Sequence, residues 1–288
     1  MTCTEITHPL DKVIAQFAGL NRVPADLPAS FGPHDESGWY LARDLLTDEK
    51  ILGEVLKSFG AFMKTDSPFL QAALLMHPYT NPVVSIAVHG LYAEGRVLDV
   101  SAENLAFRLD DAGDVAEHAF RSQRFAALSS DSAASHPDAT PVADIESLIT
   151  WMFDRMVEHH MRPFFSRVRA KTKLGLNVMW AALAGGCAEA LMGLQRAGYF
   201  TIEEAITAKT ALLELAPPPM HDRVSIYPLQ SGNRRALFMR LEVCCQKYLH
   251  PDMGKCGYCA LRPVPEQLDL QQFFFDRQVA ELDSEKRT

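Results

Sequence analysis

The sequence lacks the marks of several protein classes. Acidic residues outnumber basic ones by 36 to 28, and a net charge of −8 argues against a nucleic-acid-binding surface. No run of about 18 apolar residues predicts a transmembrane segment. The most apolar stretch, Leu174–Leu194, contains Asn177 and Glu189 and predicts a buried helix. There is no basic start typical of a secretory signal, so we expect a cytoplasmic protein.

Cysteine is also scarce. Of six cysteines, four lie between Cys244 and Cys259 in the pattern CC-x10-C-x2-C. Cytoplasmic cysteines usually remain thiols, bind metal or do redox work, which disfavours disulfides here. The pattern therefore indicates a zinc site or an iron–sulfur cluster. Cys187 is expected to be a small core residue, and Cys3 lies near the N-terminus.

The spacing of the four cysteines bears on the choice of metal. Cys256-Gly-Tyr-Cys259 fits a metal-binding turn. Cys244 and Cys245 are adjacent, and neighbouring side chains in extended chain point to opposite faces. Placing both sulfurs on one small ion would strain the backbone, whereas two irons relax this demand. His250 raises a mixed Cys/His alternative, but we interpret it as a surface histidine. Structural zinc remains open at this point.

The stretch CCQKYLHPDMGKCGYCALRP resembles the C-terminal signature of the FhuF-like ferric siderophore reductases. That resemblance implies a 2Fe–2S cluster bound by Cys244, Cys245, Cys256 and Cys259. It implies an oxidoreductase for iron acquisition, with the cluster as electron donor and no catalytic side chain identified. The expected partners are a ferric hydroxamate siderophore and an external electron donor, either a ferredoxin or a flavoprotein reductase. No G-x-G-x-x-G follows a predicted strand, so we expect no NAD(P)H activity of its own.

The implied reaction is chemically coherent. A hydroxamate siderophore holds Fe(III) with hard oxygen donors, and one added electron weakens that bonding, so iron leaves as Fe(II). Cysteine-ligated 2Fe–2S centres reach potentials of roughly −400 mV, whereas zinc carries no electron. Two alternatives are a zinc-stabilised protein that binds a siderophore or a protein partner, and a ferredoxin-like electron carrier. The large helical body argues against a simple carrier.

The fold class predicted is α+β, mainly helical, with antiparallel strands in residues 81–120 and 223–245. We expect a body over residues 1–240, with a possible internal loop at 129–141, and an iron–sulfur segment over 241–288. Residues 21–38 predict an irregular loop, and Val83–Tyr92 is ambiguous between helix and strand.

Local signals place several helix boundaries. Thr47 and Ser67 are expected N-caps, and Thr201 with Glu204 predicts a capping box. An apolar stripe predicts a helix from about residue 145, which Pro163 should kink or end because it lacks an N–H. The last helix should be amphipathic and lie within residues 268–282.

Other polar residues have ordinary interpretations. Arg234, Arg235 and Arg240 precede the cysteines and are expected on a solvated strand edge. His159 and His160 are expected to be a partly buried pair on a helix, without a role in chemistry.

Overall fold

The structure is a computed structural model that describes residues 8–20, 29–32, 34 and 38–285. It confirms the α+β class, with helices predominating. The α-helices are α1 (Asp11–Leu20), α2 (Ala42–Thr47), α3 (Glu49–Phe62), α4 (Pro68–His89), α5 (Ile145–Phe153), α6 (Arg162–Thr172), α7 (Leu176–Arg196), α8 (Ile202–Glu214) and α9 (Val264–Glu285). Short π and 3₁₀ segments are η1 (Gly90–Glu94), η2 (Ser132–Ser135), η3 (Asp154–Met161), η4 (Pro218–Met220) and η5 (Lys247–Leu249).

The described strands form three small sheets. They are β1 (Ala29–Phe31), β2 (Trp39–Leu41), β3 (Arg96–Leu98), β4 (Leu105–Leu109), β5 (Val115–Phe120), β6 (Phe125–Leu128), β7 (Ala139–Val142), β8 (Val224–Ser231) and β9 (Arg234–Leu241). The strand orders are β1-β5-β4-β2, β3-β6-β7 and β8-β9. Most pairs are antiparallel, but β1 runs parallel to β5 and β7 parallel to β6.

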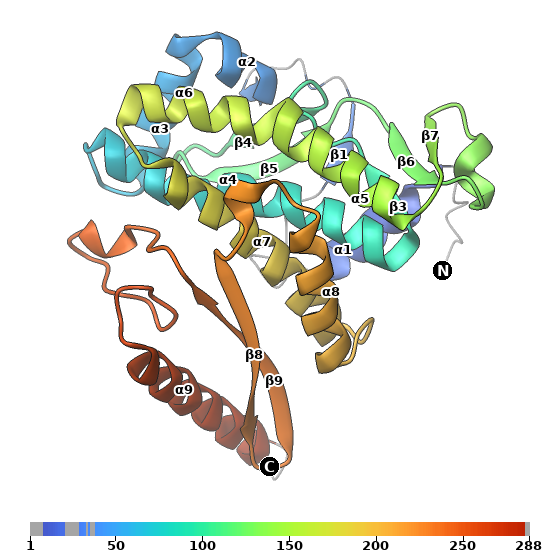
Figure 1. Cartoon of the computed structure of the whole chain (residues 1–288). Coiled ribbons are helices and arrows are strands. Elements are labelled where there is room, and N and C mark those ends of the chain that lie inside the picture. The colour runs from blue at the N-terminus through green and yellow to red at the C-terminus, as the bar shows by residue number, and fades with distance from the viewer. Residues whose placement is uncertain (1–7, 21–28, 33, 35–37, 286–288) are drawn as a thin grey trace.

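The centre of the body is the pair α4 and α7, which pack against each other (Figure 1). Cys187 of α7 is fully buried, as expected of a core residue. By length and composition α7 is apolar enough to cross a membrane, but 61% of that stretch is buried inside the protein. Gly186 lies on the helix side facing α4, where an added Cβ would approach Asn81 and Val84 within 3.4 Å. The helix is therefore the core of a folded domain.

The long helical segment that begins at Ile145 does not end at Pro163. Helical structure continues through η3 and α6 to Thr172, with Pro163 in the first turn of α6. The π segment η3 directly precedes the proline and accommodates the missing backbone donor. The carbonyl of His159, which Pro163 cannot bond, accepts the N–H of Ala102 at 3.1 Å. A backbone group from another part of the chain thus replaces the lost helical hydrogen bond.

The helix caps are partly as predicted. Ser67 caps α4, and Thr201 with Glu204 forms a reciprocal capping box at α8. Thr47 is wrong as a cap, because it ends α2. The next residue, Asp48, caps α3 instead and accepts the N–H groups of Lys50 and Ile51. Two short helices follow each other here, so the cap shifts by one residue.

The strand predictions need corrections. The expected hairpin in the 81–120 region is present as β4 and β5. The ambiguous stretch Val83–Tyr92 is helical, because its side chains are buried on nearly all faces of α4 and η1. The loop expected at 129–141 contains η2 and most of β7. The loop expected at 21–38 includes β1, and its residues 21–28, 33 and 35–37 lie outside the described part of the chain.

The C-terminal part forms an arm beside the body. The β8–β9 hairpin and α9 pack together, and both strands also contact α7 (Figure 1). The amphipathic helix is confirmed: Phe275 and Val279 of α9 are buried, whereas Phe273 and Phe274 are exposed. Phe275 contacts Phe238 of β9, with the ring centroids 5.3 Å apart and the rings tilted by 60°. The predicted boundary between 240 and 241 stays a prediction.

Candidate metal centre and adjoining pocket

The cysteine segment, residues 243–263, connects β9 to α9. Its regular structure is the single 3₁₀ turn η5. Its buried side chains are Cys244, His250 and Cys259. Because β9 and α9 pack on each other, they hold the two ends of the segment near one another. The cysteines therefore lie in irregular chain fixed at both ends.

The four cysteines meet as two pairs. The sulfurs of Cys244 and Cys259 are 3.8 Å apart. The side chains of Cys245 and Cys256 interact, so that each shifts the pKa of the other. Among the described residues, no three cysteine sulfurs lie within 4.8 Å of one another. Adjacent residues thus send their sulfurs to different partners, as the sequence pattern led us to expect.

One sulfur–sulfur distance can be compared with metal-site geometry. Two thiolates on one tetrahedral ion, with bonds of about 2.3 Å, lie about 3.8 Å apart. The Cys244–Cys259 pair has this separation. A single zinc ion would require the same separation among all four sulfurs, and the segment does not provide it. Among the described residues the segment thus holds one pair of sulfurs at the separation of two ligands on one ion, and no group of three or four cysteines is assembled around a single point.

The surroundings of the thiols differ. The hydrogen bond with Cys256 lowers the pKa of Cys245 to about 6. The same contact raises the pKa of Cys256. Burial raises the pKa of Cys244 to about 11. Cys245 is thus the sulfur that ionises most readily among these three, and the thiolate is the form that binds metals.

His250 is not the surface histidine predicted from the sequence. It is 4% exposed, and its Nε2 donates to the carbonyl of Met63 at 2.7 Å. Its Nδ1 accepts the N–H of Asp252. Both ring nitrogens are therefore engaged, which disfavours a mixed Cys/His site. The residue instead ties the cysteine segment to the end of α3.

The other singled-out residues lie away from the cysteines or are paired. Arg234, Arg235 and Arg240 form ion pairs with Asp283, Glu203 and Glu242, as expected of a solvated strand edge. His159 is exposed, whereas His160 is fully buried. The Nδ1 of His160 donates to the Val100 carbonyl, and its Nε2 faces the Tyr79 hydroxyl at 2.8 Å. Cys3 lies outside the described residues.

A pocket that the sequence did not reveal adjoins the cysteines. The α4–α7 pocket has a volume of about 390 Å³ and is lined by α3, α4, α7, β9 and the cysteine segment. The segment contributes Cys245, Lys247 and Tyr258 to its wall. Most of the remaining lining is apolar or small, including Val178 and Ala182 of α7. A sulfur of the candidate metal centre therefore faces a cavity of ligand size.

One polar pair crosses this pocket wall from helix to helix. The Nε2 of His77 on α4 lies 3.2 Å from the Oε2 of Glu189 on α7. This hydrogen bond raises the pKa of His77 above its ordinary value. The two residues are 112 positions apart in the sequence, so no local motif marks them.

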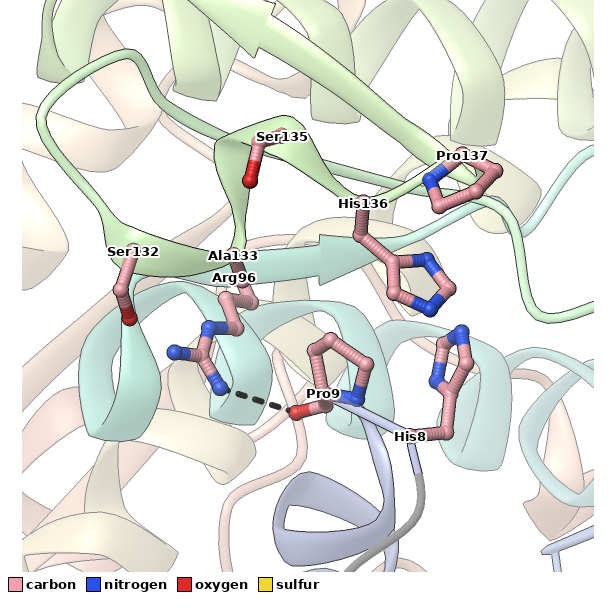
Figure 2. A pocket seen from close by; sticks show the side chains of 8 residues that line it. All are labelled: His8, Pro9, Arg96, Ser132, Ala133, Ser135, His136 and Pro137. Carbon is pink, nitrogen blue, oxygen red and sulfur yellow. Dashed lines mark hydrogen bonds between the residues drawn. The ribbon is translucent and has the colours of Figure 1, made fainter.

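A second cavity of about 520 Å³ lies at the opposite end of the chain, beside the start of α1 (Figure 2). Figure 2 shows the His8 and His136 rings facing each other, with centroids 4.6 Å apart. His8, His136 and Asp138 bring three possible ligand atoms within 4.8 Å of one another. The arginine in the wall, Arg96, is already engaged by Asp131.

The hydrogen bonds of this second cluster oppose metal binding. The Nδ1 of His8 accepts the N–H of Leu10, and the Nδ1 of His136 accepts the N–H of Asp138. Each neutral ring therefore carries its proton on Nε2. Binding a metal through Nε2 would move that proton to Nδ1, where it would face another donor. The contact of His8 with His136 and Asp138 instead links the start of the N-terminal helix to the β6–β7 connection.

Comparisons with known proteins add no family assignment. No family model matches the chain, and no curated protein matches it either.

Proposed function

We propose that this protein is a cytoplasmic iron–sulfur reductase that reduces ferric hydroxamate siderophores by one electron and releases Fe(II). The observation that carries the proposal is the 3.8 Å approach of the Cys244 and Cys259 sulfurs, beside the interacting side chains of Cys245 and Cys256. Such pairs suit a 2Fe–2S cluster, with one pair on each iron. A bound cluster would supply a one-electron donor at low potential.

The residues of the chain have distinct roles in this proposal. The four cysteines hold the cluster, and His250 anchors their segment to the body through the Met63 carbonyl. Cys245 is the ligand that also faces the α4–α7 pocket. An electron acceptor in that pocket would therefore lie next to the cluster. An external ferredoxin or flavoprotein reductase would have to supply each electron.

Anaerobic purification tests the cofactor. We expect a red-brown protein with two irons and two inorganic sulfides per chain, which is the composition of a 2Fe–2S centre. Zinc with no visible absorption would overturn the proposal and favour the zinc-stabilised binding protein. Replacing Cys3 and Cys187 by Ala together should leave the spectrum unchanged.

Single turnover tests the reaction. Chemically reduced protein is mixed with a ferric trihydroxamate under anaerobic conditions and with an Fe(II)-specific chelator present. We expect the cluster to be reoxidised and one Fe(II) to appear per electron. A cluster that keeps its electron in the presence of several ferric hydroxamates would refute the reductase and favour an electron carrier.

A further inference from the structure

We propose that the ferric chelate binds in the α4–α7 pocket, in contact with Cys245. This inference rests on the proposed function, because it names the place where the acceptor of the electron binds. The sequence motif identifies the cysteines but says nothing about a substrate site.

The position of the pocket is the first argument. Its wall joins two parts of the chain: the body supplies α3, α4 and α7, and the cysteine segment supplies Cys245, Lys247 and Tyr258. A molecule bound there touches both at once. Its volume of about 390 Å³ is within the range of ligand sites. A second cavity, beside His8 and His136, contains no cysteine.

The shape of the α7 wall is the second argument. Two alanines of α7, Ala181 and Ala182, line it with small side chains, whereas Gly185 and Gly186 let Leu241 and α4 approach the helix closely. Val178 and Ala182 are one turn apart and half-buried, so their side chains border the cavity while also packing against the edge of the core. Larger side chains at these two positions would take up space in the pocket.

The charge of the wall is the third argument. Its ionisable residues, apart from Cys245 and Tyr258, are His77, Lys247, Asp114 and Glu189. The two acids balance or exceed the bases, and the rest of the lining is mainly apolar. Desolvating a multiply charged anion here would cost much free energy. Three hydroxamates neutralise Fe(III), whereas three catecholates leave a charge of −3. The wall therefore favours an electroneutral chelate.

Two side chains can orient such a chelate. His77 and Lys247 are the donors of the wall that can reach oxygen atoms of a bound ligand. Glu189 holds His77 from the neighbouring helix. A few polar groups in an apolar pocket are the usual means of fixing a ligand's orientation.

Gallium(III) complexes test the site separately from the reaction, because Ga(III) is not reduced. Binding of a gallium trihydroxamate to the holoprotein is measured by calorimetry. We expect Ala182→Phe and Val178→Phe each to weaken binding by about tenfold or more. Ala190→Phe is the matched control, since Ala190 is a half-buried alanine of α7 outside the pocket. It should bind like the unmodified protein.

The outcomes separate this inference from the proposed function. The visible spectrum of each variant reports whether the cluster is intact. Unchanged gallium binding in both pocket variants would overturn the pocket, even if the protein reduces ferric hydroxamates. Tighter binding of a gallium tris-catecholate than of the trihydroxamate would overturn the charge argument. The unmodified protein could instead lack the cluster or fail to reduce ferric hydroxamates, while gallium binding is lost only in the pocket variants. That result would refute the proposed reductase but would still support the binding site.

Discussion

The body of this protein and its cysteine segment differ in what they bury. One continuous apolar cluster runs through the body from Leu10 to Met220 and includes Val224, Ile226, Leu237 and Met239 of the hairpin. In the cysteine segment the buried side chains are two cysteines and a histidine. Burial of apolar surface stabilises the first region. The second has too little apolar surface for that, so the proposed metal ligation and a few hydrogen bonds would have to stabilise it.

Removal of the metal should have the largest effect and should affect only one region. Metal ligation contributes folding free energy where the ligands lie, on the order of 10 kcal/mol for structural zinc. We expect backbone amides of residues 243–263 to exchange orders of magnitude faster in the apoprotein. Amides of α4 and α7 should keep their protection. Equal protection of the segment with and without metal would refute this division.

Single cysteine substitutions test which residues bind the proposed cluster. Ser in place of Cys244, Cys245, Cys256 or Cys259 should abolish or badly destabilise the cluster, measured as iron per chain. The Cys187→Ala variant is the control, because this cysteine is buried in α7 away from the segment. Loss of iron in the control together with a normal spectrum in Cys244→Ser would show the ligand set to be wrong.

Acid should destabilise the body. Burial lowers the pKa of His89, His118 and His160 to about 4 from 6.5. Between these pH values the unfolded chain binds more protons, so the free energy of unfolding falls as the pH drops below about 6.5. At pH 5 each histidine accounts for on the order of 2 kcal/mol.

Tryptophan fluorescence can follow this effect, because Trp39, Trp151 and Trp180 all lie in the body. We expect denaturant midpoints to fall steadily from pH 7 to pH 5. The His160→Gln variant should be less stable at pH 7 but should show a shallower fall, because glutamine takes up no proton. A flat profile in the unmodified protein would contradict the buried neutral histidines.

Loss of the His250 anchor should have a smaller and local effect. The His250→Ala variant leaves the Met63 carbonyl without its donor, and a lost buried hydrogen bond costs about 1–3 kcal/mol. We expect faster exchange in residues 243–263 and slower recovery of iron after reconstitution. His159→Ala removes an exposed histidine and is the control. A body destabilised as much as the segment would show that the anchor serves the whole fold.

The sequence predicted local features well. The helix of α7, the capping box at Thr201 and the β8–β9 hairpin each depend on residues close together in the chain. The four cysteines stand out for the same reason, since they lie within sixteen residues, and their role as ligands stays a prediction. The adjacency of Cys244 and Cys245 predicted only that both sulfurs would not easily bind one small ion.

Long-range features were not predictable. The burial of His250 depends on a carbonyl 187 residues away, and a backbone acceptor leaves no trace in the sequence. The continuation of the helix through Pro163 depends on Ala102 supplying a hydrogen bond. The α4–α7 pocket is assembled from five parts of the chain, so no single stretch signals it.

The smallest effect should come from the charges that join α9 to the hairpin. Arg234 of β9 pairs with Asp283 near the end of α9, with side chains 30% and 48% exposed. Exposed ion pairs contribute about 0.2–1 kcal/mol and are screened by salt. The Asp283→Asn variant should therefore raise amide exchange in α9 only slightly, and a double-mutant cycle with Arg234→Gln should give a coupling of that size. The coupling should disappear at high salt.

A salt-resistant coupling of about 2 kcal/mol or more, above the range of exposed pairs, would mean that the ion pair is the main link between α9 and the hairpin. The apolar contact between Phe238 and Phe275 would then be the lesser link.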